Sequence, residues 1–154
     1  MTELEYLERA EKARGKLYRA ALLTLGGEAA ADEAVYKGYL GFRKLRQEQY
    51  FGTWLMRILI NVCRDELRRR GRELAMEELP ETAGEAFDAL PLKQAIRRLP
   101  GQLRDVIILR YFTGLTLEET ASALGLPRGT VSTRQRRALE LLKLDLTTEE
   151  EVAL

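Results

Sequence analysis

Apolar residues recur at steps of three and four along most of the chain, the spacing that places side chains on one face of an α-helix. The first such segment runs from the N-terminus to a Gly-Gly pair at 26–27, and the second runs from about Glu28 to Leu45. Thr2 and Glu5 have the spacing of a capping box at the start of the first helix. No segment shows the two-residue alternation of a half-buried strand. The pattern therefore predicts an all-α protein.

A third helix is expected from about Tyr50 to Gly71, with an apolar side and a basic side. The polar positions recur at steps of four, three and four, which aligns them on one face behind two aromatic rings. This candidate face consists of Tyr50, Trp54, Arg57, Asn61, Arg64 and Arg68. Rings beside arginines suit the stacking of unpaired nucleic-acid bases. A core role for Trp54 and a solvated basic helix end explain the same residues, and the sequence alone leaves both interpretations open.

Charge changes sign along the chain, although the whole carries only +1 from 25 basic and 24 acidic residues. Residues 1–72 carry 15 basic and 10 acidic side chains, and residues 92–144 carry 10 basic and four acidic ones. Between them, residues 73–91 hold six acids, no base and little helical periodicity, and residues 145–154 hold four acids. We predict two small helical domains, at 1–72 and 92–144, joined by a flexible acidic linker and followed by a frayed acidic tail.

The second half contains the spacing of a helix-turn-helix. Ala121 is small enough for two helices to approach, and Gly125 falls where the first helix must end with positive φ. Val131 then points back to the same core. Thr116 with Glu119 forms another capping box, which opens the first of the two helices.

The second helix of this motif is expected to start near Thr130, with Val131, Ala138, Leu139 and Leu142 on its core side. Its outer side is rich in hydroxyl and guanidinium groups, which bind phosphates and base edges. A solvated arginine face explains this composition too, but the agreement with the turn residues favours contact with the DNA major groove. The candidate contacts are Arg128, Thr130, Ser132, Thr133, Arg134, Arg136 and Arg137.

The residues suggest no catalytic or metal site. With one cysteine, Cys63, and no histidine, an intrachain disulfide, the usual zinc sites and histidine base catalysis are excluded. No glycine-rich phosphate loop or nucleophile elbow is present, because no strand precedes a suitable turn. We expect no enzyme activity, cofactor, metal or small-molecule substrate, and a core position for Cys63. Without a signal peptide or an apolar run of about 18 residues, the protein is expected to be cytoplasmic.

Over about residues 15–72 and 92–143, the chain resembles a bacterial sigma-70-family RNA polymerase sigma factor of the extracytoplasmic-function (ECF, group 4) type. The stretch Phe51-Gly-Thr-Trp-Leu-Met-Arg-Ile-Leu-Ile-Asn61, followed by Asp65 and Arg68-Arg-Arg70, is similar to the minus-ten-reading helix of that family. Leu99-Pro100 with Val106–Phe112, and Gly125–Arg134 with Arg137-Ala138, are similar to its minus-35-reading domain.

The resemblance implies a division of labour between region 2, at 1–72, and region 4, at 92–144. Region 2 would bind the clamp helices of the largest polymerase subunit and capture unpaired minus-ten bases with the 45–51 loop and the basic face of the third helix. Region 4 would bind the polymerase flap and insert residues 130–137 into the minus-35 major groove. The acidic linker would follow the path of nascent RNA. Core polymerase, promoter DNA and an anti-sigma factor are the implied partners.

Core binding would involve Asp32 and Glu33 on the second helix, at the place of a Gln-Glu pair in the family. Ala29 stands where that motif usually has Asp, so the acidic character is kept only in part. The same two acids also suit a helix N-terminus on electrostatic grounds alone. A sigma-like decoy that binds an anti-sigma factor without promoter activity is the alternative function. A stand-alone helix-turn-helix repressor fits less well, because it leaves the tryptophan-bearing helix without a role.

Overall fold

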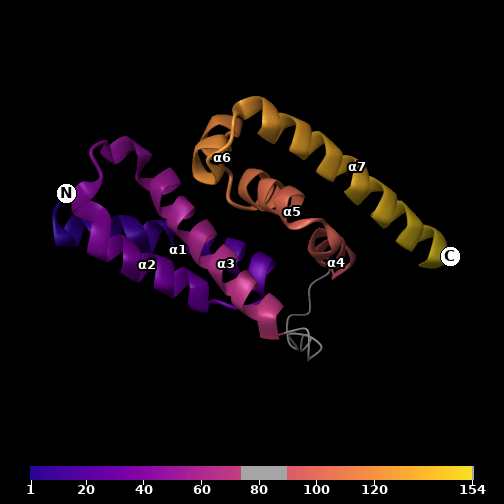
Figure 1. The fold of residues 1–154 in the computed structure, drawn as a ribbon, viewed down its shortest axis with the longest axis horizontal. Coiled ribbons are helices and arrows are strands. Elements are labelled where there is room, and N and C mark those ends of the chain that lie inside the picture. Colours follow the sequence, from indigo (N-terminus) through magenta and orange to yellow (C-terminus); the bar gives the residue numbers. More distant parts are fainter. Residues whose placement is uncertain (74–89, 154) are drawn as a thin grey trace.

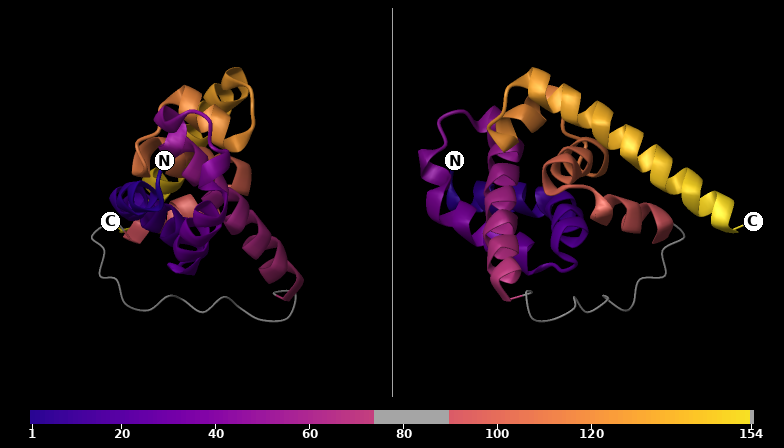
Figure 2. Two further views of the ribbon diagram at one scale, coloured as in Figure 1. Left: turned by 90° about the vertical axis from the view of Figure 1, so that its left-hand side faces the viewer. Right: turned by 45° about the vertical axis from the view of Figure 1, so that its right-hand side comes forward.

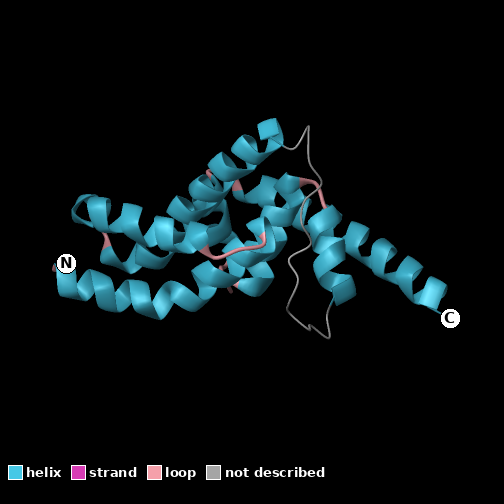
Figure 3. Ribbon diagram, turned by 90° about the horizontal axis from the view of Figure 1, so that it is seen from below, coloured by secondary structure: helices cyan, strands magenta, loops and turns pink. Residues whose placement is uncertain are grey.

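The structure, a computed structural model, describes residues 1–73 and 90–153, with side chains placed for residues 1–71 and 91–144. Every regular element in these ranges is helical (Figures 1 and 3), which confirms the predicted all-α class. The elements are α1 (Glu3–Leu25), α2 (Ala29–Gly41), the 3-10 turns η1 (Phe42–Lys44) and η2 (Glu48–Tyr50), α3 (Phe51–Glu73), α4 (Leu90–Arg98), α5 (Gly101–Ile107), the π-helical turn η3 (Ile108–Phe112), α6 (Leu117–Leu124) and α7 (Arg128–Ala153). The predicted linker at 73–91 lies outside the described residues except at its two ends.

Helices α1 to α3 pack around Tyr6, which is fully buried. The Tyr6 hydroxyl donates a 2.6 Å hydrogen bond to the Val35 carbonyl, and its ring stacks on Phe42 with 5.0 Å between centroids. Leu4 and Leu7 have helical spacing with the buried Ala10, yet they are 66% and 52% exposed. At this end of α1, helical spacing is compatible with two overlapping sets of residues on the buried side. The set that includes the large aromatic ring of Tyr6 occupies the core.

Helix α3 is buried on two sides, not on one as the sequence suggested. The predicted side, with Leu55, Leu59 and Val62, is buried and lies toward α1 and α2. A second row at helical spacing is buried as well; it consists of Thr53, Met56, Ile60 and Cys63. Its first member donates a hydrogen bond from Thr53 Oγ1 to Glu119 Oε2 on α6, at 3.3 Å. The second buried side therefore exists because the other half of the chain packs against α3.

The second half folds around Val106, Ile108, Leu109 and Val131, all fully buried. Pro100 separates α4 from α5, with extended backbone at φ −52° and ψ 142°. Helix α5 then widens into the π-helical turn η3. This turn is closed by a 3.1 Å bond from the Thr113 N–H to the Ile108 carbonyl.

The helix-turn-helix forms as the sequence predicted. Thr116 and Glu119 make the capping box at the start of α6, and Gly125 ends α6 with φ at 67°. Val131, Ala138 and Leu142 are buried on α7, but Leu139 is 40% exposed, so its predicted core position was wrong. Helix α7 begins at Arg128, two residues before the expected start. Its backbone stays helical through Ala153, where we expected a frayed tail.

The two halves lie against each other and share one buried core (Figures 1 and 2), a point that the sequence left open. Helix α3 contacts α6, and α1 contacts both η3 and α4. The polar link between Thr53 and Glu119 lies within this junction. The helix with the basic stripe therefore also connects the halves, together with α1.

Candidate nucleic-acid interface

The polar stripe predicted on the third helix forms one side of α3, which we name the α3 basic face; it consists of Tyr50, Trp54, Arg57, Asn61, Arg64 and Arg68. Arg57, Asn61 and Arg68 are exposed, and the Arg64 side chain is 40% exposed. Arg68 pairs within its own helix with Asp65, at 3.7 Å. The face thus presents amide and guanidinium donors to solvent over about three helical turns.

Trp54 is half-buried, so the structure combines features of the core role and the base-stacking role that the sequence left open. Its ring lies 5.8 Å from the Phe51 ring, centroid to centroid, and packs against the core. The rest of the indole remains accessible. Tyr50, just before α3, is 53% exposed. An anchored ring with a free surface is suited to stacking on a base, because little side-chain freedom is lost on binding.

Arg64 connects the α3 basic face to an acid of the second half. Its Nε lies 4.0 Å from Oδ2 of Asp105 on α5, a side chain only 13% exposed. Burial raises the pKa of the Asp105 carboxyl above its ordinary value. The positive charges of three guanidinium groups act to lower this pKa; from the largest effect to the smallest, they are those of Arg64, Arg104 and Arg134. One mostly buried acid thus interacts with a candidate DNA-contacting arginine from each half, a link that residue spacing does not reveal.

The candidate residues of the second half define what we name the α7 polar face: Arg128, Thr130, Ser132, Thr133, Arg134, Arg136 and Arg137. Thr133, Arg136 and Arg137 are exposed, whereas Thr130, Ser132 and Arg134 are half-buried. Arg128 bonds to the exposed Glu118 carboxylate at 3.1 Å. The Thr133 hydroxyl donates to the Gly129 carbonyl at 3.0 Å and keeps its lone pairs as acceptors.

Arg134 differs from its neighbours, because its position lies nearer the core side of α7 and its charge acts on Asp105. Gln135 is on the same side and accepts a 2.8 Å hydrogen bond from Arg110 Nε. Arg110 was not among the predicted site residues, and Gln135 was expected only as part of the 130–137 segment in the major groove. The outermost part of the α7 polar face is formed by Thr133, Arg136 and Arg137.

The predicted core-binding acids, Asp32 and Glu33, are exposed on α2. Asp32 Oδ1 lies 4.0 Å from Arg14 Nη2, and Glu33 Oε1 lies 3.4 Å from Lys37 Nζ; both ion pairs are at the surface. Tyr36 and Leu40 follow Asp32 at steps of four and are 62% and 65% exposed. Neither Tyr36 nor Leu40 was among the predicted site residues, although the four-residue steps place both on the same side of α2 as Asp32. Together they make an exposed acidic and apolar stripe on α2.

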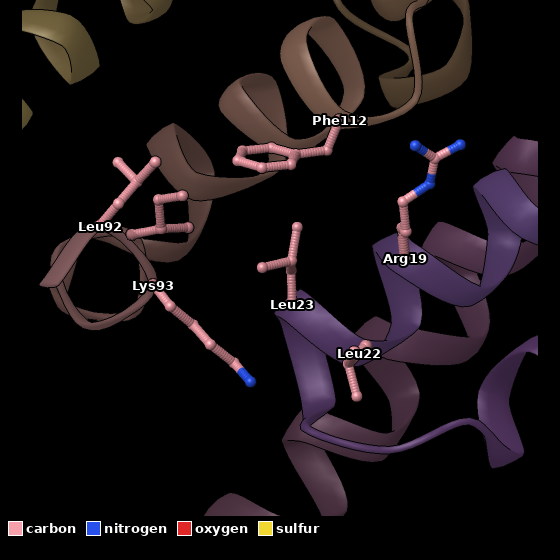
Figure 4. Close-up of a pocket in the computed structure, with 7 residues that line it drawn as sticks. Arg19, Leu22, Leu23, Leu92, Lys93 and Phe112 are labelled. Carbon is pink, nitrogen blue, oxygen red and sulfur yellow. The ribbon is translucent and has the colours of Figure 1, made fainter. Parts of the chain in front are cut away.

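An apolar groove of about 130 Å³ opens where α1 meets α4 and η3 (Figure 4). Leu22 and Leu23 of α1 lie on one side, and Leu92 and Phe112 lie on the other. The cationic side chains that border it are Arg19 and Lys93. The groove is therefore formed jointly by the two halves, and its wall is apolar with a basic edge.

Three further observations concern metal binding, membrane spanning and the single cysteine. No cluster of three or more potential metal-binding side chains occurs in the part of the chain that the structure describes. None of the helices formed by the described residues has both the length and the apolarity needed to cross a bilayer. Cys63 is buried, and burial together with the Asp105 charge raises its pKa to about 12, so the thiol is a weak nucleophile.

Fold and site define a two-part helical protein with a helix-turn-helix in its second part. Two family models match these parts: Sigma-70 region 2 at residues 10–73 and Sigma-70, region 4 at residues 95–144. The chain is 31% identical to the ECF RNA polymerase sigma factor SigW of Bacillus subtilis, covering 86% of this chain and 84% of SigW. It is 30% identical to the RNA polymerase sigma factor SigV of the same species, over 77% and 75% of the two chains. The chain belongs to the sigma-70 family, among the extracytoplasmic-function (ECF) sigma factors.

Solved structures share the fold. The sigma factor RpoE of Bartonella quintana, in complex with the anti-sigma factor NepR, aligns with a TM-score of 0.76 at 23% identity, covering 93% of this chain and 97% of that one. CnrH, in complex with the cytosolic domain of CnrY, aligns with a TM-score of 0.73 at 23% identity, covering 96% and 90%. At these identities the likeness supports the arrangement of helices.

Proposed function

We propose that this protein directs core RNA polymerase to promoters by recognising the minus-35 and minus-ten elements and starting to melt the DNA. The observation that carries the proposal is the presence of two unlike polar faces on one chain. The α7 polar face belongs to a helix-turn-helix and suits a duplex, whereas the α3 basic face adjoins aromatic rings and suits unpaired bases. Such a subunit would act in the cytoplasm and perform no covalent chemistry.

Minus-35 recognition would take place through α7 in the major groove. The exposed guanidinium groups of Arg136 and Arg137 can donate to guanine edges or phosphates, and the Thr133 hydroxyl can contact either. Arg128 stands at the N-terminal end of α7, where contacts with the phosphate backbone fix the register of a helix-turn-helix. Its surface pair with Glu118 is exposed and weak, so DNA can replace it.

Minus-ten melting would use the α3 basic face. A flipped base would stack on the free surface of Trp54 or on Tyr50, while Arg57 and Asn61 bind the backbone and base edges. The surrounding positive charge favours a single strand, since each neutralised phosphate releases a counterion. Arg64 and Arg68 extend the same surface along α3.

Polymerase binding would use the exposed stripe on α2. Asp32 and Glu33 supply acidic contacts for the clamp helices of the largest subunit, and Tyr36 and Leu40 supply adjacent apolar area. Region 4 would bind the flap. Aromatic side chains with a charged rim are common at interfaces between proteins, which supports extending the contact beyond the two acids.

An anti-sigma factor is the proposed regulator. One structural neighbour described above, RpoE of Bartonella quintana, was solved with such a partner. The apolar groove between α1 and α4, with its basic edge, offers surface for such a partner (Figure 4). The same observation keeps open the alternative of a decoy that binds an anti-sigma factor without promoter activity.

Run-off transcription with purified core polymerase and a genomic promoter library separates these functions. We expect specific transcripts when this protein is added and none with core alone. A variant with Asp32 and Glu33 changed to Lys should lose transcripts while remaining folded, because reversed charge opposes core binding. Absence of transcripts from every template, combined with binding to an anti-sigma factor, would establish the decoy instead.

A further inference from the structure

Arg110 makes contacts that are unusual for a residue outside both polar faces. Its Nε donates to Gln135 Oε1 at 2.8 Å, and its Nη1 donates to the Leu115 carbonyl at 2.8 Å. Leu115 is the residue just before Thr116, the N-cap of α6. One half-buried guanidinium therefore joins η3, the entry to α6 and the N-terminal third of α7.

The π-helical turn brings this side chain to its place. η3 inserts a wider turn at Ile108–Phe112, and turns of this kind are frequent at functional sites. The chain leaves it through the Thr113 N–H bond to Ile108 and a 3.0 Å bond from the Leu115 N–H to the Leu109 carbonyl. The backbone that holds Arg110 is thus fixed on both sides.

Gln135 is placed to control how α7 is rotated about its axis. It comes one turn after Val131 and three residues before Ala138, both fully buried. Those small apolar contacts hold α7 in place but tolerate sliding, whereas a guanidinium bond has a fixed direction. Arg110 can only donate, so the amide oxygen of Gln135 must point toward it.

We propose that Arg110, acting through Gln135, is a positioning residue for minus-35 recognition; this inference rests on the function proposed above. The outward residues Thr133, Arg136 and Arg137 share one rigid helix with Gln135. A rotation of about 20° would move a side-chain tip that lies ~6 Å from the helix axis by about 2 Å. That displacement is enough to break a hydrogen bond to a base edge.

The test uses the full chain with core polymerase and a random-sequence duplex pool, from which the wild-type holoenzyme selects its preferred minus-35 sequence. The measured quantity is the specificity ratio, the affinity for that sequence over the affinity for a scrambled one. Arg110→Lys and Gln135→Leu should each lower this ratio about tenfold, the value of one lost base contact. Affinity for the scrambled duplex and its salt dependence should stay unchanged for Arg110→Lys, because net charge is kept.

One double variant and two control variants test whether the effect comes from the bond between Arg110 and Gln135. The double variant should lose no more than either single variant, because both remove one interaction. Gln135→Glu keeps the acceptor and should retain most of the ratio, and Gln94→Leu, an exposed position on α4, should leave it unchanged. Unchanged ratios in Arg110→Lys and Gln135→Leu, or additive losses, would overturn the inference while leaving the proposed function intact. Failure of the wild type to enrich any sequence would overturn the proposed function, and this inference with it.

Discussion

Gly38 occupies the middle of α2, where Ala would ordinarily favour a helix by ~1 kcal/mol. In this fold a Cβ at that position would collide with the Tyr6 hydroxyl and lie 3.0 Å from Leu55 Cδ1. The Tyr6 hydroxyl cannot move away without losing its bond to Val35. The weak helix former is therefore the residue that permits close packing of α2 against α1 and α3.

Replacing Gly38 by Ala should destabilise the protein by about 1–3 kcal/mol, because overpacking outweighs the gain in helix propensity. Gly15 provides a matched control, since it lies within α1 with nothing within 4 Å of an added Cβ. Gly15→Ala should stabilise by about 0.5–1 kcal/mol. Urea unfolding followed by circular dichroism measures both, and equal changes at the two positions would contradict the packing account.

Trp54 should matter for strand opening and not for duplex recognition. Replacing it by Ala should weaken binding to the unpaired minus-ten strand by ~1–3 kcal/mol, since stacking on the indole is lost. Permanganate reactivity of promoter thymines in the holoenzyme complex reports the opening. Tyr111→Ala, another exposed ring lying outside both faces, is the control. Equal losses of opening and minus-35 binding would rule out the stacking role.

Alanine substitutions of two arginines on α7 should have different effects, one on DNA binding and the other on stability. Arg136 is exposed, and Arg136→Ala should weaken minus-35 binding by ~1–3 kcal/mol if it contacts a base. Arg134 is half-buried near the core side of α7 and within electrostatic reach of the mostly buried Asp105, so Arg134→Ala should chiefly lower the free energy of unfolding. Paired measurements of duplex affinity and urea stability distinguish these outcomes. Loss of affinity in Arg134→Ala at unchanged stability would assign it to the DNA contact.

At the scale of elements, structural features set by residues close in sequence could be predicted, and features set by residues distant in sequence could not. The capping box at Thr116 and the turn at Gly125 depend on neighbouring residues, so the sequence revealed them. The second buried side of α3 depends on a half that lies distant in sequence, and periodicity alone identified only one side. The bond from Arg110 to Gln135 starts from a π-helical turn and joins residues 25 positions apart, so it leaves no spacing signal. Candidate DNA-binding residues could be chosen by residue type, but the sequence did not predict how deeply each of them is buried.

The start of α6 should be sensitive to acid. The Thr116 N–H, bonded to Glu119 Oε1 at 3.0 Å, is the main cause that holds the pKa of Glu119 below its ordinary value. A lowered pKa in the folded protein adds stability above the pKa of the unfolded chain, and this stability is lost as pH falls through the folded pKa.

Glu119→Gln should therefore lose less stability than the wild type between pH 7 and pH values below about 4, near the ordinary glutamate range. Urea unfolding at both ends of this interval measures the difference. Glu118→Gln is the control, because that exposed carboxylate pairs with Arg128 and makes no helix cap. Identical acid losses in the wild type and Glu119→Gln would contradict the capping account.

At the scale of the molecule, the docking of the halves and the proposed capture of a DNA strand use the same helix. Arg64 belongs to the α3 basic face and also pairs with Asp105 of the second half. Thr53, on the adjoining side of α3, bonds to Glu119. A DNA strand on the α3 basic face would compete for Arg64, so strand binding should weaken the junction between the halves.

Cys63 offers a native reporter of this junction. It is 2% exposed on the side of α3 that includes Thr53, and it lies within electrostatic reach of Asp105. Arg64→Gln removes the charged link and should speed labelling of Cys63 by a soluble disulfide reagent several-fold, because opening of the junction exposes the thiol. Arg68→Gln is the matched control, since Arg68 pairs within its own helix with Asp65. Labelling of the wild type should also accelerate when core polymerase and promoter DNA are added. Equal rates in both variants, with no acceleration in the complex, would show that the halves stay docked while the protein acts.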